Sequence, residues 1–240
     1  GQSSYENISS GSDLTLDTTK VYDGNTTANV SVNGVVPVFN NDIVSVTAYA
    51  NYTNKNVGNN PIAIHYLLSG DTANYIVPED ITTNGSITCK PVSVVGTKVD
   101  STKVYDGTSD INIISEGSSP DFIAGDSVAV ATNALLVGET YGVATEVAVS
   151  YYLVGTDNGN YCIANEKDTL QQNVVISPKL IDIAFVKSAI DSVKVYDATT
   201  DVNAVLTLDP SCIVGDDDVQ LNIMAYYDSK NVGNRRTTRR

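Results

Sequence analysis

Apolar and polar residues alternate with a period of two along several stretches of this chain. In residues 44–52 every second residue is apolar or aromatic, and the residues between are mostly polar. The same alternation returns in residues 62–68, 128–134, 147–153 and 219–227. A period of two is typical of strands with one buried face, and clusters of Gly, Asn, Asp and Pro separate these runs. No stretch of helical length shows a 3.6-residue period, so we predict an all-β fold.

A short motif occurs three times and reveals an internal repeat. Residues 20–24 and 103–107 both read KVYDG, and residues 194–198 read KVYDA. Three more landmarks recur at similar distances from this motif. They are an acidic turn at 41–42, 125–126 and 215–216, a glycine turn at 57–58, 141–142 and 232–233, and an Asn-Tyr pair at 74–75 and 160–161. Four landmarks in register predict two whole copies and a third that stops partway.

The repeat predicts the domain organisation. We expect a flexible N-terminal segment at 1–10, modules at 11–89 and 90–178, and a partial module with a basic tail at 179–240. The joins are short and contain Pro91 or Pro178, which favours a stiff string over freely tumbling modules. The partial module should bury less core and be less stable, because the second-half strands are missing and four arginines follow Asn234.

The Asn-Tyr segments favour a particular kind of module. Residues 71–77 and 157–163 resemble the Asp-x-Ala-x-Tyr-x-Cys pattern of immunoglobulin domains, in which the Tyr ring is buried and its hydroxyl returns to the backbone. We therefore expect Tyr75 and Tyr161 to be structural, in tandem immunoglobulin-like β-sandwich modules. A different small β-rich module is the alternative.

Composition excludes several classes of function. The 240 residues include 28 acidic and 14 basic ones, for a formal net charge of −14, which argues against nucleic acid as a partner. No apolar run approaches 18 residues, so no membrane insertion is expected. The three cysteines, Cys89, Cys162 and Cys212, lie far apart without a C-x-x-C spacing, so we expect buried thiols.

Taken together, the motifs resemble the YDG repeat domain. The resemblance rests on residues 19–24, the acidic turn, Lys-Asn-Val-Gly at 55–58, and Ser-Gly-Asp at 69–71 leading to Asn-Tyr, and it covers nearly all of residues 11–234. That family occurs in tandem in large bacterial surface proteins, including adhesins of the filamentous-haemagglutinin kind. The resemblance implies an extracellular, bacterial, non-enzymatic stalk or adhesive region. The chain departs from the pattern at Ala198 and at residues 139–142, which read Glu-Thr-Tyr-Gly.

The KVYDG motif has a structural and a metal-binding interpretation. In the first, a strand ends in a tight turn, where Asp accepts from backbone N–H groups and Gly takes a positive φ. The residues concerned are Tyr22, Asp23, Gly24, Tyr105, Asp106, Gly107, Tyr196 and Asp197. In the second, aspartates near the joins supply oxygen ligands for Ca²⁺. The candidates are Asp23 with Asp42, Asp106 with Asp126, and Asp197 with Asp216 and its two neighbours.

Other side chains carry weaker signals for chemistry. Lys20, Lys103 and Lys194 are interpreted as strand-edge lysines that oppose aggregation, and an isopeptide cross-link to Asn is the alternative. His65, the single histidine, is expected to be solvated. We assign no catalytic and no cofactor-binding residue.

The resemblance therefore implies a non-enzymatic structural region outside the cell or at its surface, with signal and anchor expected elsewhere. Its expected partner is an unidentified ligand on a host or neighbouring cell, a glycan among the candidates, and the chain is expected to be monomeric. The first alternative is a carbohydrate-binding module, in which exposed tyrosines such as Tyr49 or Tyr152 stack on sugar faces. The second is a hydrolase-associated domain.

Overall fold

The computed structural model describes residues 6–7, 14–32, 41–182 and 186–239, and it confirms the all-β prediction. Helical structure in these residues is confined to short 3₁₀ turns at Thr72–Asn74, Asn158–Asn160 and Pro210–Cys212. No helix of the described chain is long and apolar enough to cross a membrane. The residues group into two compact units. Unit 1 holds residues 1–99, 112–134 and 148–169, and unit 2 holds 100–111, 135–147 and 170–240.

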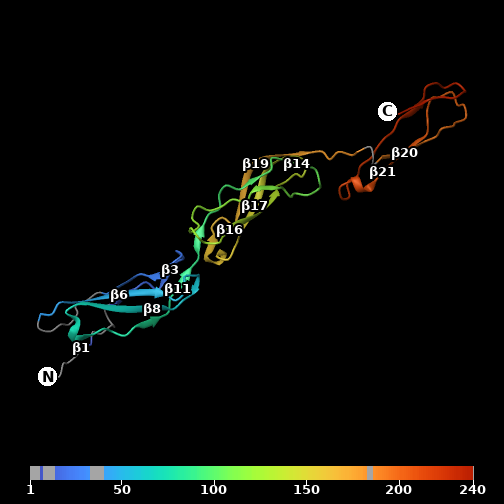
Figure 1. Cartoon of the computed structure of the whole chain (residues 1–240). Helices are drawn as coiled ribbons and strands as arrows, with labels where there is room; N and C mark the ends of the chain where they lie inside the picture. The colour runs from blue at the N-terminus through green and yellow to red at the C-terminus, as the bar shows by residue number, and fades with distance from the viewer. Residues whose placement is uncertain (1–5, 8–13, 33–40, 183–185, 240) are drawn as a thin grey trace. The chain divides into compact units, whose positions relative to one another are not determined.

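The main sheet of unit 1 is antiparallel. It has the order β10-β8-β6-β4, with β4 (Thr27–Ala28), β6 (Val44–Tyr52), β8 (Ile62–Gly70) and β10 (Ile81–Thr83). Strands β6 and β8 lie side by side in a long ladder that runs from Val44↔Gly70 to Tyr52↔Ile62 (Figure 1). Buried or half-buried side chains alternate with exposed ones along most of both strands, which confirms the predicted period of two.

Smaller sheets of unit 1 bring segments distant in sequence together. β3 (Thr19–Val21) runs parallel to β11 (Ser86–Thr88), which also pairs with β7 (Gly58–Asn59). β2 (Leu14–Leu16) pairs with β5 (Val30–Val32), and β13 (Lys98–Val99) with β15 (Ile113–Ser115). Two more pairs are parallel: β1 (Glu6–Asn7) with β9 (Tyr75–Ile76), and β12 (Lys90–Val92) with β18 (Tyr161–Ile163). Apart from β1, the predicted flexible segment 1–10 lies outside the described residues.

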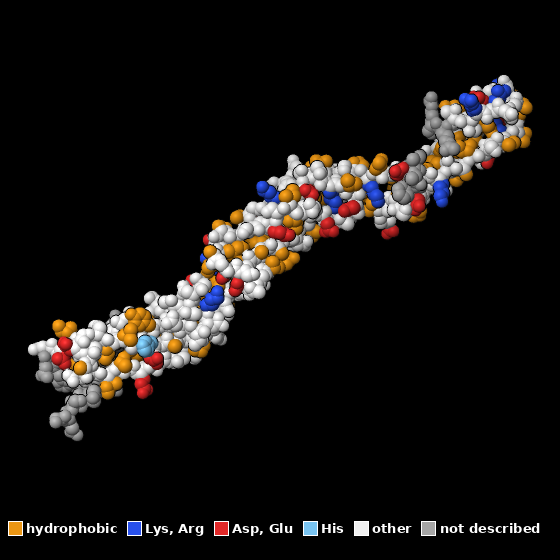
Figure 2. Space-filling view, in the orientation of Figure 1, with side chains coloured by type: hydrophobic (Ala, Val, Ile, Leu, Met, Phe, Trp, Pro, Cys, Tyr) orange, Lys and Arg blue, Asp and Glu red, His pale blue; other side chains and the backbone are white. Residues whose placement is uncertain are grey.

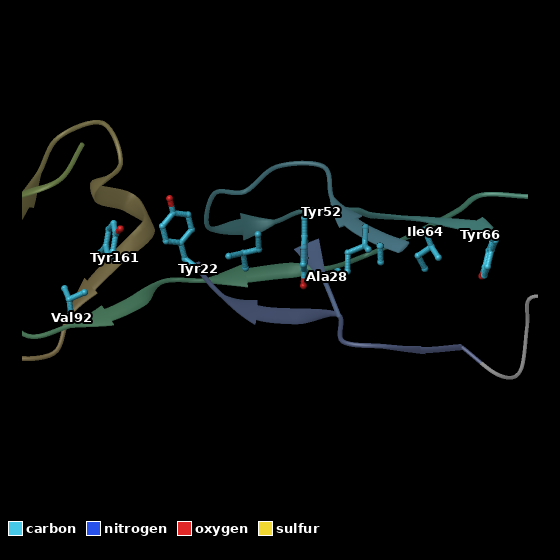
Figure 3. Close-up of a cluster of buried hydrophobic side chains, with 10 residues drawn as sticks. Tyr22, Ala28, Tyr52, Ile64, Tyr66, Val92 and Tyr161 are labelled. Carbon is cyan, nitrogen blue, oxygen red and sulfur yellow. The ribbon is translucent and has the colours of Figure 1, made fainter. Parts of the chain in front are cut away.

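The hydrophobic core of unit 1 contains residues of two successive copies. Its first-copy members come from β4, β6, β8 and β11 together with Tyr22. Val92 and Tyr161 of the second copy belong to the same buried cluster, and Tyr22 lies next to Tyr161 (Figure 3). Only Cys89 separates β11 from β12, so the first copy passes into the second without a linker.

In unit 2, the second KVYDG motif repeats the parallel pairing of the first. β14 (Thr102–Val104) runs beside β19 (Lys167–Ser177), as β3 runs beside β11. The sheet that contains this pair has the order β14-β19-β17-β16, with β16 (Ala129–Leu136) and β17 (Gly142–Val154), of which residues 129–134 and 148–154 belong to unit 1. Further along the chain, β20 (Val186–Ile190) pairs with β21 (Ala204–Leu208), and β22 (Ala225–Tyr227) with β23 (Thr237–Arg239).

The predicted strand at 219–227 is shorter than its alternating pattern suggests. Only Ala225–Tyr227 forms a strand, and the Val219 and Leu221 side chains are 37% and 39% exposed. The first copy holds the equivalent β6 by a nine-residue ladder to β8, whereas the third copy supplies the three-residue pairing with β23 and an isolated bridge between Asp201 and Tyr226. Within described residues 186–239, the buried hydrophobic side chains are Cys212 and Tyr227.

Candidate functional site

Each of the three KVYD motifs forms the same tight turn. The aspartate carboxylate accepts a hydrogen bond from the backbone N–H two residues later, at 3.1 Å for Asp23 and 2.9 Å for both Asp106 and Asp197. The residue after the aspartate has a positive φ, which is 81° at Gly24, 76° at Gly107 and 66° at Ala198. Alanine is strained in this conformation, so the third turn stores a local cost that the other two avoid.

The lysine of each motif holds its turn together. Lys20 Nζ lies 2.7 Å from the Asp23 carboxylate and donates to the carbonyl oxygens of Asn25 and Thr27 at 2.8 and 3.0 Å. Lys103 and Lys194 each lie 2.8 Å from their own aspartate; Lys103 also donates to the carbonyl oxygens of Thr108 and Asp110, and Lys194 to that of Asp201. The hydrogen bond from lysine and that from the backbone lower the aspartate pKa to about 2 in the second and third copies. These lysines therefore organise a turn, rather than only guarding a strand edge.

The lysine contacts also bear on the isopeptide bond, which was the alternative interpretation of these lysines. Lys20 Nζ is 3.1 Å from the amide oxygen of Asn25, but Lys103 and Lys194 face the hydroxyls of Thr108 and Thr199. A threonine side chain has no amide group, so it cannot form an isopeptide bond with lysine. The hydrogen-bonded arrangement of the lysine, in contrast, recurs in all three copies.

The motif tyrosine joins one copy to the next. In unit 1, Tyr22 Oη donates to Asp126 Oδ2 of the second copy at 2.8 Å. Tyr161 Oη donates to the same oxygen at 2.6 Å and accepts from the backbone N–H of Ile123 at 3.0 Å. The two rings meet edge to face at 5.5 Å between centroids. We call Tyr22, Asp126, Tyr161 and Asn160 the clasp.

Asn160 adds a second set of bonds between the copies. Its Oδ1 accepts from the backbone N–H of Val57 at 2.9 Å, and its Nδ2 donates to Asn56 Oδ1 at 3.0 Å. The side chain is only 5% exposed, so both bonds are shielded from water. Lys55 Nζ of the same loop lies 3.9 Å from Asp126 Oδ1. The Lys-Asn-Val-Gly landmark is therefore the surface on which the next Asn-Tyr pair docks.

The electrostatics of the clasp favour neutral tyrosines beside the Asp126 side chain. Burial, and then the hydrogen bond to Asp126, raise the pKa of both Tyr22 and Tyr161. The Asp126 side chain is 5% exposed, and hydrogen bonds to a charged acceptor are among the stronger ones. The arrangement holds the two copies together, because its side chains form hydrogen bonds with other groups of the protein.

Unit 2 contains the corresponding contact of the second copy with the third. Tyr105 Oη donates to Asp217 Oδ2 at 2.8 Å. The backbone N–H of Asp217 donates to the Val214 carbonyl at 3.1 Å, just as that of Asp126 donates to the Ile123 carbonyl. Asp217 is thus the counterpart of Asp126. The sequence alignment on Gly-Asp, which pointed to Asp216, is wrong by one residue because the turn starts one residue before Gly215 but two residues before Gly125.

The Asn-Tyr tyrosines are buried but differ from an immunoglobulin tyrosine corner. Tyr75 and Tyr161 are 8% and 6% exposed. Their hydroxyls donate to the carboxylates of Asp42 and Asp126 in the acidic turns, where the immunoglobulin pattern predicted a backbone acceptor. The acidic turn and the Asn-Tyr landmark recur together because they are bonded to each other.

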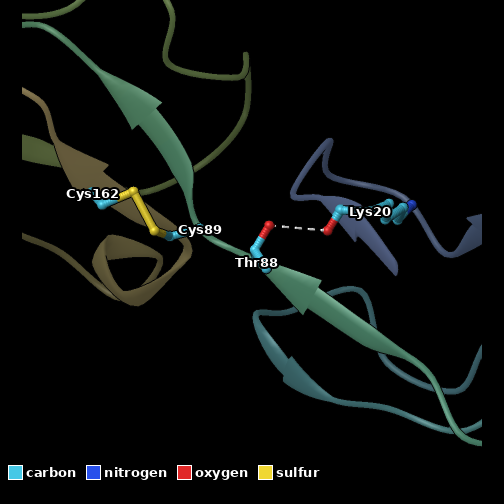
Figure 4. Close-up of a disulfide and its surroundings, with 4 residues drawn as sticks. All are labelled: Lys20, Thr88, Cys89 and Cys162. Atoms are coloured by element: carbon cyan, nitrogen blue, oxygen red, sulfur yellow. Dashed lines mark hydrogen bonds between the residues drawn. A yellow bond between two sulfur atoms is a disulfide. The ribbon is translucent and has the colours of Figure 1, made fainter. Parts of the chain in front are cut away.

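A disulfide reinforces the join, contrary to the prediction of buried thiols. Cys89 is bonded to Cys162 (Figure 4). Cys212 is a buried free thiol. The two bonded cysteines lie 73 residues apart. They meet because β12 and β18 pair in parallel, with Pro91 opposite Cys162, a pairing that cysteine spacing does not reveal.

Most of the aspartates proposed as Ca²⁺ ligands have protein partners, and Asp216 is exposed. Asp23, Asp106 and Asp197 bind lysines, whereas Asp42 and Asp126 accept from tyrosines. Among the described residues, no three His, Cys, Asp or Glu side chains are grouped so as to hold a metal ion.

The remaining candidates lie at the surface. Tyr49, Tyr152 and Tyr196 are 52%, 56% and 54% exposed. His65 is visible on the surface, and its Nδ1 is 2.7 Å from Asp80 Oδ1 (Figure 2). Sequence reasoning overlooked Asn160 and Asn56 as contact residues, although both fall within landmarks that it had identified.

Comparison with known proteins agrees with the three-copy organisation. The family model described as the YDG domain matches residues 8–83, 88–169 and 178–239. No curated protein and no solved structure matches the chain.

Proposed function

This chain belongs to the YDG domain family, and we propose that it is a non-enzymatic structural region of an extracellular bacterial protein, such as the stalk of a surface adhesin. The observation that carries the proposal is the clasp in unit 1. There a tyrosine of one copy and an aspartate of the next share a buried hydrogen bond, next to a second tyrosine. Such a contact fixes the orientation of successive copies, which is the property that a spacer needs.

Two further features support stiffness at this join. The first copy passes into the second through Cys89 alone, and that residue is covalently tied to Cys162. The buried core of unit 1 also includes residues of both copies. Repeat proteins gain much of their stability from such contacts between neighbours.

The disulfide and the surface composition support a place outside the cytosol. Disulfides persist mainly in oxidising compartments and on cell surfaces. The net charge of −14 keeps a chain soluble and opposes non-specific association. The proposal includes tandem immunoglobulin-like modules and a place in a surface adhesin.

Distance measurements between two spin labels test the stalk function. Thr47→Cys and Asn133→Cys, in a Cys212→Ser background, place labels on exposed strand positions of the first and second copies within unit 1. We expect a narrow distribution of distances between the two labels when the clasp is intact. The double variant Tyr22→Phe/Asn160→Ala should broaden this distribution, and the control Tyr66→Phe should leave it unchanged. A broad distribution in the native clasp would contradict the proposal.

A second candidate function, glycan binding, has one specific observation in its favour. Tyr49 on β6 lies opposite His65 on β8, and both side chains are more than half exposed. An exposed aromatic ring beside a hydrogen-bonding side chain suits a sugar face. Binding on a glycan array that is lost with Tyr49→Ala would support this function, and an array without signal would count against it.

A further inference from the structure

Unit 1 has a polar cleft at a point where the chain changes its partner strand. β4 pairs with β6 over two residues, and one residue later the chain pairs with β2 as β5. A cleft of about 730 Å³ lies at this fork, and its walls include Asp17, Asn29, Tyr49 and Asn51. The cleft is a consequence of the topology, because strands that diverge leave space between them.

The same fork occurs in all three copies. In each copy, a backbone N–H donates to a carbonyl oxygen across the fork at 2.7 Å. The three bonds run from Tyr52 to Thr26, from Leu136 to Ser109 and from Tyr227 to Thr200. Next to these bonds, Thr27 pairs with Asn51, Asp110 with Leu135 and Asp201 with Tyr226. The backbone of the fork is therefore a property of the module.

The exposed side chains at the fork differ from copy to copy. Counted back from the three bonds, Tyr49 of the first copy is equivalent to Asn133 and Met224. Asn51 is equivalent to Leu135 in the second copy. The exposed tyrosine and amide thus belong to the first copy, and the fold of the fork does not require them.

The cleft of the first copy has the chemistry of a sugar site. Tyr49 is 52% exposed, and Asn51 lies two residues along the same strand, hence on the same face. An aromatic ring offers a rigid apolar face on which the apolar face of a sugar ring can stack. An amide both donates and accepts hydrogen bonds, as a sugar hydroxyl does. Asn29 supplies a second amide, which Asp17 Oδ2 holds in place at 3.0 Å.

The charge of the cleft disfavours acidic sugars. Its charged lining residues are Asp17, Lys20 and Asp23. Lys20 Nζ lies 2.7 Å from the Asp23 carboxylate and donates to the Asn25 carbonyl oxygen, so its charge is already engaged. Asp17 leaves the cleft negative, and a like charge on the ligand would be repelled. A ligand without carboxylate or sulfate groups fits this environment.

We propose that this cleft binds a neutral saccharide, with one sugar ring stacked on Tyr49 and its hydroxyls bonded to Asn29 and Asn51. The inference rests on the second candidate function, glycan binding, and gives it a site and a class of ligand. The cleft lies on the β4 side of Tyr49, whereas His65 lies on the β8 side. The two sides can therefore be tested separately.

A glycan array tests the class of ligand. The array carries neutral oligosaccharides of glucose, galactose and mannose beside sialylated and sulfated counterparts, and it is probed with the whole chain. We expect signal on neutral members alone. No binding of a neutral saccharide at about 1 mM would overturn the proposal. Binding to acidic glycans alone would also overturn it, but would leave glycan binding as a function.

Matched variants then locate the bound sugar, with a neutral saccharide from the array titrated by calorimetry. Tyr49→Asn and Asn51→Leu give the first copy the residues of the second, which carries them at the same fork. Each should weaken binding about tenfold, since one removes the ring and the other the amide. Tyr141→Asn removes a tyrosine of unit 2 that is 65% exposed, and it should leave binding unchanged.

The amide variants separate this proposal from glycan binding in general. Asn29→Ala should also weaken binding, and it decides the question if Asn51→Leu does not fold. If Tyr49→Asn abolished binding while Asn51→Leu and Asn29→Ala left it unchanged, the sugar would lie on the His65 side of the ring. That result would overturn the cleft assignment and retain glycan binding. None of these outcomes affects the spin-label test of the stalk function.

Discussion

The hydroxyl of Tyr22 donates a hydrogen bond to the carboxylate of Asp126, a residue 104 positions further along the chain. Tyr22 directly follows β3 of the first copy, and Asp126 lies in the acidic turn of the second. The pair shows why both landmarks recur with every copy. One landmark supplies the donor, and the other supplies the acceptor on the following copy.

Removing the Tyr22 hydroxyl should weaken the clasp. We expect Tyr22→Phe to lower the free energy of unfolding by about 1–3 kcal/mol, since it removes a buried hydrogen bond to a charged acceptor. Urea titration followed by circular dichroism measures the change. The control is Tyr66→Phe, whose buried hydroxyl has no hydrogen-bond partner in the described structure and whose loss should cost little. Equal destabilisation by the two variants would show that the hydroxyl bond contributes nothing.

The disulfide should contribute measurably to stability. Cys89→Ser with Cys162→Ser should lower the free energy of unfolding by about 2–4 kcal/mol, because the bond closes a long loop in the unfolded chain. A reductant should lower the melting temperature of the native chain but not that of the double variant. Cys212→Ser, which removes the free thiol, should retain the response to reductant. If the chain were unfolded without reductant and all three cysteines then reacted as free thiols, the disulfide would be contradicted.

Glycine at position 198 should stabilise the third copy. Ala198 has a φ of 66°, and the equivalent residues of the other copies are glycines. We expect Ala198→Gly to raise the free energy of unfolding of this region by about 1 kcal/mol, since glycine adopts a positive φ without steric cost. Hydrogen exchange in residues 186–227 measures it.

The converse substitution is the control for position 198. Gly107→Ala should destabilise the second turn by more than the third turn gains. Its φ is 76°, and the added Cβ would lie 2.6 Å from Val214 Cγ1. If neither Ala198→Gly nor Gly107→Ala changed hydrogen exchange, backbone strain would not explain why glycine occupies this position of the turn.

Alkaline pH should open the clasp. Burial and Asp126 raise the pKa of Tyr22 and Tyr161 in the folded chain. An unfolded tyrosine loses its proton at about pH 10, so the stabilisation is complete below that pH and is lost progressively above it. The urea midpoint should therefore fall as pH rises above about 10, and the fall should be shallower in Tyr22→Phe. A midpoint independent of pH in this range would contradict the raised pKa.

Local features of the chain were predictable because neighbouring residues determine them. The alternation in residues 44–52 and 62–68 predicted two half-buried strands, and β6 and β8 are those strands. The same reasoning failed at residues 219–224, because a strand also needs a partner. The third copy provides a ladder only for Ala225–Tyr227.

The sequence by itself determined the all-β class, the three copies and the residues that recur in each, because these depend on periodicity and on the conformational preferences of single residues. The tertiary structure alone decided which of those residues meet. Cys89 reaches Cys162 because the adjoining strands β12 and β18 pair in parallel, and Tyr22 reaches Asp126 because the first copy packs against the second. Strand partner and register depend on packing across a whole core, so no local pattern in the chain encodes them.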